Sequence, residues 1–189
     1  MIRILAGEKK GARVRVAKSR SVRPTAANAR KVLFDILAGQ LEGTRWLDLY
    51  AGSGAVGLEA LSRSAAACVL VESAPKCLAV IRRNIAQLGY GDRCRLIGAR
   101  VETALKRLVE QGETFDFIFL DPPYRGDDAT RCLDALGGQT ASALLRSPDG
   151  LVVAQLSSHT DARAIHGILE LTRQKSVGDT RICFYRLRS

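Results

Sequence analysis

Asp48-Leu49-Tyr50-Ala51-Gly52-Ser53-Gly54-Ala55-Val56-Gly57 joins the end of an apolar segment to the start of a helical one. Its three glycines allow the backbone to turn tightly and to approach a ligand closely. The next apolar segment ends at Glu72, 20 residues after Gly52, and an acid at that point can accept hydrogen bonds from ribose hydroxyls. This order of strand, glycine loop, helix and acid predicts a nucleotide-binding α/β sheet.

Apolar and helical segments continue to alternate on both sides of this loop. The predicted strands are 45–50, 67–72, 94–97, 115–120 and 151–156, and the predicted helices are 23–38, 56–63, 74–88 and 101–110. The strands are nearly continuous apolar runs, as in a parallel sheet that is covered on both faces. Segments 169–176 and 180–187 have no helix between them and predict a closing antiparallel hairpin. We therefore predict an α/β fold with a Rossmann-like, doubly wound, mostly parallel seven-stranded sheet.

The positive charge is concentrated at the N-terminus. The net charge is +10, and residues 1–31 hold ten basic residues and one acidic residue. A main domain with nearly equal numbers of positive and negative charges, preceded by a cationic N-terminal segment, is typical of an enzyme that docks on a polyanion. The alternative is a solvated segment that only aids solubility. The cations that we expect to contact the polyanion are Arg3, Lys9, Lys10, Arg13, Arg15, Arg20 and Arg23.

The basic segment also has a β-like pattern. Apolar residues alternate on either side of a turn at 7–11, which predicts a hairpin with Arg13 and Arg15 side by side on its solvent face. We expect a small hairpin unit, residues 1–22, followed by one main α/β domain, residues 23–189.

Composition argues against several other classes of protein. No apolar run approaches the 18 or more residues of a membrane helix, and the N-terminus lacks the apolar core of a secretion signal. The cysteines are odd in number and have no metal-ligand spacing; they are Cys68, Cys77, Cys94, Cys132 and Cys183. We therefore expect a cytoplasmic protein with reduced cysteines and no metal. We also expect a monomer.

Asp48 distinguishes between two ligands that the glycine spacing allows. Gly52-x-Gly54-x-x-Gly57 also fits a nicotinamide or flavin dinucleotide, whose pyrophosphate lies against the loop and the helix N-terminus. A carboxylate at the strand end would repel that group, whereas S-adenosylmethionine carries an ammonium and a sulfonium that it would attract. We therefore predict S-adenosylmethionine as the ligand. The residues expected to bind it are Asp48, Tyr50, Gly52, Ser53, Gly54, Glu72 and Val101.

A second motif, Asp121-Pro122-Pro123-Tyr124, follows the strand predicted to end at residue 120. Strand ends line the ligand crevice of a doubly wound sheet, so this tetrapeptide should face the methyl donor. The Asp121 carboxylate and the Pro122 carbonyl can hold both N–H groups of an exocyclic base amine and orient its lone pair. Two prolines restrict the backbone, and Tyr124 offers a face for base stacking. We predict a catalytic role for all four residues.

These motifs resemble those of class I S-adenosylmethionine-dependent methyltransferases that modify amino nitrogens. Three further segments resemble the bacterial 16S ribosomal RNA guanine-N2 methyltransferases. They are Arg23-Pro24-Thr25 with Leu33-Phe34 downstream, the stretch from Leu47 to Arg63, and Gly178-Asp179-Thr180 leading to Phe184-Tyr185. The resemblance implies methyl transfer to N2 of a guanine in the helix 31 loop of the small ribosomal subunit. It further implies that the hairpin holds RNA and that residues 121–124 hold the base.

One segment departs from the pattern of that family. Its members usually carry an acidic or amide side chain near the adenine, where this chain reads Gly98-Ala99-Arg100-Val101. Arg100 cannot accept a hydrogen bond from the adenine amine, so backbone contacts at Val101 are the expected substitute. Three alternatives stay open from the sequence. They are an amino-methyltransferase acting on DNA adenine or protein glutamine, an NAD-dependent oxidoreductase, and an RNA-binding module without catalysis.

Overall fold

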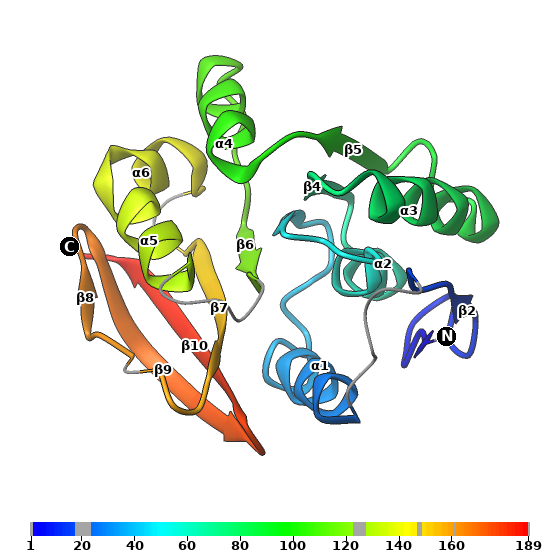
Figure 1. Ribbon diagram of the computed structural model, residues 1–189, viewed down its shortest axis with the longest axis horizontal. Coiled ribbons are helices and arrows are strands. Elements are labelled where there is room, and N and C mark those ends of the chain that lie inside the picture. Colours follow the sequence, from blue (N-terminus) through cyan, green and yellow to red (C-terminus); the bar gives the residue numbers. More distant parts are fainter. Residues whose placement is uncertain (1, 18–23, 123–127, 147–148, 161, 189) are drawn as a thin grey trace.

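The structure is a computed structural model that describes residues 2–17, 24–122, 128–146, 149–160 and 162–188. A central sheet separates two groups of helices (Figure 1). The first five strands of the sheet are parallel and the last three are antiparallel. This arrangement confirms the predicted Rossmann-like, mostly parallel α/β fold.

Eight strands lie in the order β5-β4-β3-β6-β7-β10-β9-β8. Their bounds are β3 (Arg45–Leu49), β4 (Ala67–Glu72), β5 (Cys94–Gly98), β6 (Phe117–Leu120), β7 (Leu151–Ser157), β8 (Ile165–His166), β9 (Leu169–Val177) and β10 (Thr180–Leu187). The prediction of seven strands was wrong by one. The additional strand, β8, is two residues long, and two residues cannot display the alternation by which a strand is recognised.

Helices cover both faces of the sheet (Figure 1). On one face lie α1 (Pro24–Ile36), α2 (Ala55–Ser62) and α3 (Pro75–Leu88); on the other lie α4 (Val101–Glu110), α5 (Asp128–Ala135), the π-helical η1 (Leu136–Thr140) and α6 (Ala141–Leu144). Successive side chains of a strand point to opposite faces. Trp46 therefore packs into the first core, whereas Leu47 and Leu49 pack into the second. This double burial explains the continuous apolar runs.

The sequence analysis predicted no element between β6 and β7, where the structure has α5, η1 and α6. Gly137 and Gly138 interrupt the helical pattern there, and Gly138 has a non-helical ψ of −150°. A Cβ added at Gly137 would lie 1.8 Å from the carbonyl oxygen of His166. Glycine is therefore required where η1 approaches β8, and this long-range contact has no local signal in the sequence.

The N-terminal hairpin is confirmed. β1 (Ile2–Arg3) pairs with β2 (Arg13–Val14) in antiparallel register, and Val14 is buried in the core that α1 and α2 share. Arg13 and Arg15 are exposed on the opposite face, as the alternation predicted. The boundary expected at residue 22 lies outside the described residues and stays a prediction.

Buried polar side chains of α2 fix the hairpin to the main domain. Both carboxylate oxygens of Glu59, a residue with no exposed surface, accept hydrogen bonds from the N–H groups of Leu5 (2.8 Å) and Ala6 (3.0 Å). A Cβ added at Gly7 would lie only 1.7 Å from the carbonyl oxygen of Ser62. The turn of the hairpin therefore lies directly against the end of α2.

The five cysteines are all buried. Among the described residues, no cluster of three or more His, Cys, Asp or Glu side chains is placed to hold a metal ion. None of the helices in those ranges combines the length and the apolar character that a membrane-spanning helix requires.

Candidate functional site

The glycine loop connects β3 to α2 at the carboxyl edge of the sheet. Tyr50, Gly52 and Gly54 have positive φ angles of 64°, 62° and 76°, and Gly54 is the N-cap of α2. A residue with a Cβ is strained in this region of backbone conformation. Tyr50 therefore stores strain at the point where the strand ends, and residues held in this way are common at ligand sites.

Asp48 lies beneath this loop with 1% of its surface exposed. Its Oδ2 accepts a hydrogen bond from the Gly57 N–H at 3.0 Å. A Cβ added at Gly57 would lie 2.6 Å from the Cys68 Sγ and 2.5 Å from a methyl group of Leu70. The third glycine of the motif therefore allows α2 to approach the sheet closely enough to bind the carboxylate.

Glu72, at the end of β4, holds the loop from the other side. Its Oε2 accepts a hydrogen bond from the Gly52 N–H at 2.9 Å, and its Oε1 accepts from Ser73 and Ala74 at 2.8 and 2.9 Å. Glu72 is 6% exposed. The predicted strand-end acid therefore lies against the glycine loop, where a ribose bound at this edge would meet it.

Three carboxylates converge at this edge. The sheet register pairs Leu49 with Val71 of β4 and with Leu120 of β6, so Glu72 and Asp121 follow on the two sides of Tyr50. The pKa of Asp48 is raised to about 8, chiefly by burial. The hydrogen bond from Gly57 lowers the pKa, and the charges of Asp121 and Glu72 raise it. A site of this polarity repels a pyrophosphate and attracts a cation.

The tetrapeptide is described only in its first half. Asp121 is partly buried and Pro122 is buried, directly after β6 and beside the glycine loop. Pro123 and Tyr124 lie outside the described residues, so the stacking role of Tyr124 stays a prediction. The two predicted motifs nonetheless adjoin one another, as the sheet topology required.

The remaining residues predicted to bind the ligand are Ser53 and Val101. Ser53 is partly buried within the glycine loop. Val101 is the first residue of α4, which follows β5 along the same edge, and Arg100 is the exposed N-cap residue of that helix. The first turn of α4 instead supplies an acid, Glu102. Burial raises the pKa of Tyr50, and the neighbouring Cys132 and the charge of Glu102 raise it further.

Five of the seven cations predicted to contact RNA lie on the described hairpin. Arg3, Lys10, Arg13 and Arg15 are exposed on the hairpin. The Lys9 ammonium lies 6.0 Å from the ring centroid of Tyr90. Arg20 and Arg23, also predicted, lie outside the described residues.

Asn84 of α3 is a site residue that the sequence analysis missed. This wholly buried amide accepts a hydrogen bond from the Arg15 N–H (2.9 Å) and donates to the carbonyl oxygens of Arg15 (3.0 Å) and Ser53 (2.9 Å). One side chain thus joins the hairpin to the glycine loop. A signal was present, because Asn84 lies between Ile81 and Ile85 on the apolar face of α3, and a buried amide there must have partners.

Known proteins resemble the chain along most of its length. A sequence profile of the family described as "Conserved hypothetical protein 95" matches residues 2–186. A Bacillus subtilis (strain 168) protein named "Putative rRNA methyltransferase YlbH" is 30% identical over 187 residues, which are 99% of this chain and 100% of that protein. Ribosomal RNA small subunit methyltransferase D of Escherichia coli (strain K12) is 37% identical over 124 residues, 66% of this chain and 61% of the relative.

A solved structure has the same fold. The protein described as "Putative methyltransferase yhhF from Escherichia coli" superposes with a TM-score of 0.82 at 26% identity, over 99% of this chain and 98% of that one. The match to the Escherichia coli methyltransferase D spans less than two thirds of that relative, whereas the profile and the Bacillus relative span nearly the whole chain. The chain therefore belongs to the family described as conserved hypothetical protein 95, and it is similar to proteins named ribosomal RNA methyltransferases.

Proposed function

We propose that this protein transfers a methyl group from S-adenosylmethionine to the exocyclic N2 amine of a guanine in 16S ribosomal RNA, in the helix 31 loop of the small subunit. The observation that carries the proposal is the convergence of Asp48, Glu72 and Asp121 at one edge of the sheet. The relatives named ribosomal RNA methyltransferases support the class of substrate. We expect a monomer that acts on the small subunit or on an assembly intermediate.

The residues at the sheet edge suit the proposed methyl donor. S-adenosylmethionine supplies an electrophilic methyl group on a sulfonium, and it also carries an ammonium. The strand-end Glu72 gives this edge a negative potential, which favours both cations, and a bound cation would in turn favour the ionised form of the buried Asp48. Glu72 would hold the ribose hydroxyls, and the N–H of Val101 at the start of α4 would face the adenine.

The acceptor is held by the tetrapeptide. The Asp121 carboxylate and the Pro122 carbonyl accept hydrogen bonds from the base amine and orient its lone pair. The carboxylate stabilises the positive charge that develops on the nitrogen, and it can accept the proton that the nitrogen loses. Catalysis is then chiefly a matter of position and charge, with Tyr124 stacking on the base.

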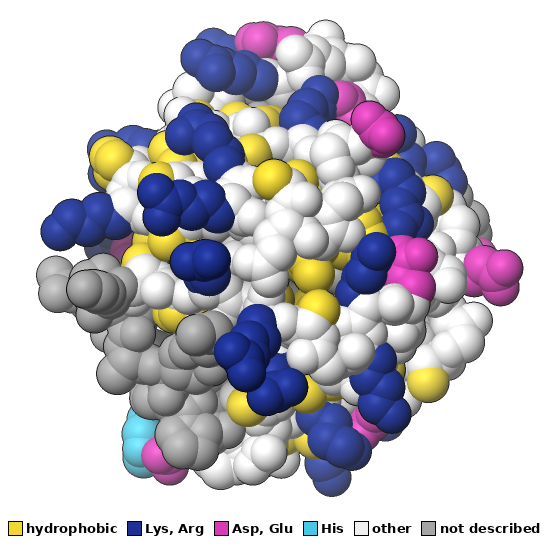
Figure 2. All heavy atoms as spheres, turned by 90° about the vertical axis from the view of Figure 1, so that its right-hand side faces the viewer, with side chains coloured by type: hydrophobic (Ala, Val, Ile, Leu, Met, Phe, Trp, Pro, Cys, Tyr) yellow, Lys and Arg dark blue, Asp and Glu magenta, His cyan; other side chains and the backbone are white. Residues whose placement is uncertain are grey.

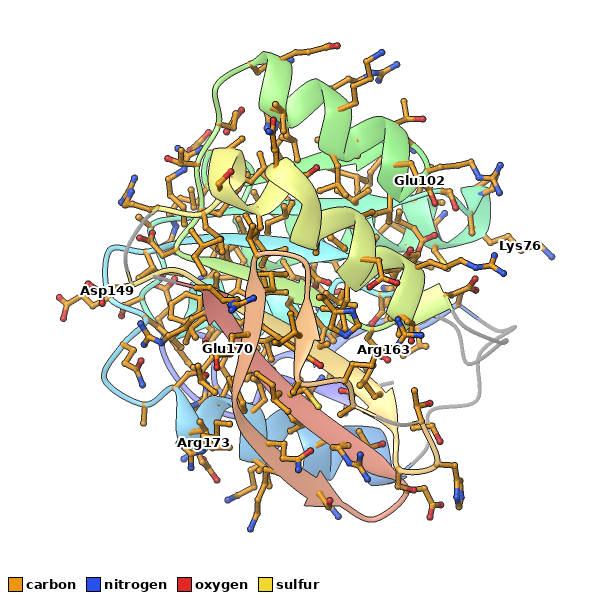
Figure 3. All side chains as sticks on the ribbon, turned by 90° about the vertical axis from the view of Figure 1, so that its left-hand side faces the viewer. Lys76, Glu102, Asp149, Arg163, Glu170 and Arg173 are labelled. Atoms are coloured by element: carbon orange, nitrogen blue, oxygen red, sulfur yellow. The ribbon has the colours of Figure 1, made fainter. Side chains whose placement is uncertain are left out.

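Labelled S-adenosylmethionine tests the proposal directly. We expect transfer to unmethylated 16S rRNA or small subunits, and none to duplex DNA or to a translation factor. Asp121→Ala should lower the transfer rate by about 10²-fold or more while leaving donor binding by calorimetry nearly unchanged. Asp149→Ala is the matched control, because Asp149 precedes β7 and lies at the opposite edge from Lys76 and Glu102 (Figure 3). Absence of transfer to both RNA acceptors would refute the proposal.

A further inference from the structure

We infer that the RNA-contacting surface extends from the hairpin along α3, through a stripe formed by Lys76 and Arg83 (the α3 stripe), toward the methyl-transfer site. The inference rests on the proposed function. It concerns α3, whose cations were not among the predicted RNA contacts. The occupant is the phosphate backbone of the rRNA on the way from the hairpin to the target base.

The hairpin lies directly beside the stripe. The exposed Gln87 donates a hydrogen bond from Nε2 to the Arg13 carbonyl oxygen at 2.9 Å, and the neighbouring Asn84 binds the backbone of Arg15. Lys76, Arg83 and Gln87 are spaced i, i+7 and i+11, which aligns them along one side of the helix. The stripe is therefore a continuation of the β2 surface.

The α3 stripe also leads toward the carboxyl edge of the sheet, where we propose the methyl-transfer site. α3 begins at Pro75, directly after the Ser73 and Ala74 amides that Glu72 binds. The eleven helical steps from Lys76 to Gln87 span about 16 Å along the helix. Figure 3 places Lys76 at the same edge of the molecule as Glu102 in the first turn of α4. A strand that follows α3 from the hairpin therefore arrives at the carboxyl edge of the sheet.

The charges on α3 are not accounted for by helix stability. The helix contains no acidic residue, and Lys76 lies in its first turn, where the helix dipole makes a cation mildly unfavourable. Lys76 and Arg83 are exposed, and no ion pair to either is present in the described part of the chain. Arg45, Arg63 and Arg95, in contrast, are paired with Glu113 or Glu59.

The face that includes α3 and the hairpin has a cationic surface. Figure 2 shows this side of the molecule, and Lys and Arg side chains predominate over Asp and Glu on it. A surface of this kind attracts the backbone of RNA and gives a salt-dependent affinity.

The test compares two adjacent arginines of one helix. Arg83 lies on the stripe, whereas Arg82 is also exposed but points about 100° away, on the side opposite Asn84. The affinity for an unmethylated 16S rRNA transcript is measured by filter binding over a series of salt concentrations. Arg83→Ala should flatten the plot of log affinity against log salt by roughly 0.7–0.9, and Lys76→Ala with Arg83→Ala by roughly twice that.

Arg82→Ala should leave the slope and the affinity close to those of the unmodified protein. Equal effects of Arg82→Ala and Arg83→Ala, or no effect of either, would overturn the stripe. Calorimetry with S-adenosylmethionine should give the same donor affinity for all variants. Methyl transfer by the unmodified protein is measured in the same series. If the proposed function is wrong, the unmodified protein transfers no methyl group. If only the α3 stripe is wrong, transfer is normal and the variants do not differ in the salt dependence of RNA binding.

Discussion

Asp48 combines deep burial with two acidic neighbours. Its pKa of about 8 means that the folded protein without ligand holds a proton on this carboxyl near neutral pH. Burial penalises the charged form and is the main cause. A cation bound nearby would favour the ionised form, so the residue is poised between a neutral state and a ligand-paired state.

The first residue-scale prediction concerns stability. Between pH 4 and 8 the unfolded chain has lost the Asp48 proton and the folded protein retains it, so the free energy of unfolding falls as pH rises, by at most about 1.4 kcal/mol per pH unit. Asp48→Asn removes this fall, because the amide does not titrate. Urea unfolding at pH 5, 6, 7 and 8 measures the difference.

The exposed Asp92 provides the control, since Asp92→Asn should run parallel to the unmodified protein. Asp48→Asn should gain stability relative to it as pH rises, and should bind S-adenosylmethionine less tightly. Parallel curves for all three proteins would show that Asp48 does not retain its proton.

Elements formed from local patterns were predictable, and those formed by distant contacts were not. The segment from β3 to α4 was predicted nearly to the residue, because continuous apolar strands and the helical period of α3 are read directly from the chain. β8 and η1 were missed because they stabilise each other through the close approach of Gly137 to His166. The site shows the same division, since both motifs were found and the long-range amide of Asn84 was not.

A prediction at the scale of elements concerns the docking of the hairpin on α2. Gly7 and Gly11 have φ angles of 82° and 84°, but a Cβ at Gly7 meets Ser62 and a Cβ at Gly11 meets nothing within 4 Å. Gly11→Ala should cost about 1–2 kcal/mol for backbone strain, and Gly7→Ala should cost more and detach the turn. Hydrogen exchange should then accelerate at the Leu5 and Ala6 amides in Gly7→Ala alone. Equal exchange in the two variants would show that the hairpin does not depend on this contact.

At the scale of the whole molecule, the uneven distribution of charge gives a further prediction. Lys9→Ala with Lys10→Ala should weaken binding to RNA of many sequences and flatten its salt dependence, because phosphate contacts carry no sequence information. Lys106→Ala with Arg107→Ala removes an equally charged, exposed pair from α4, which covers the other face of the sheet. This control should bind RNA as the unmodified protein does. A comparable loss of RNA affinity in both double variants would mean that RNA binding depends only on the net charge of the protein.

The amide of Asn84 joins the hairpin to the glycine loop, two parts of the protein for which we propose very different ligands. We propose that the hairpin contacts RNA and that the glycine loop binds the methyl donor. Asn84 binds the backbone of the hairpin through its oxygen and nitrogen, and that of the loop through its nitrogen. Truncation of that side chain would leave three backbone groups without a hydrogen-bond partner, and each would lower the free energy of unfolding by about 1–3 kcal/mol. The hairpin and the glycine loop are therefore coupled through one side chain, and a displacement of either would be transmitted to the other.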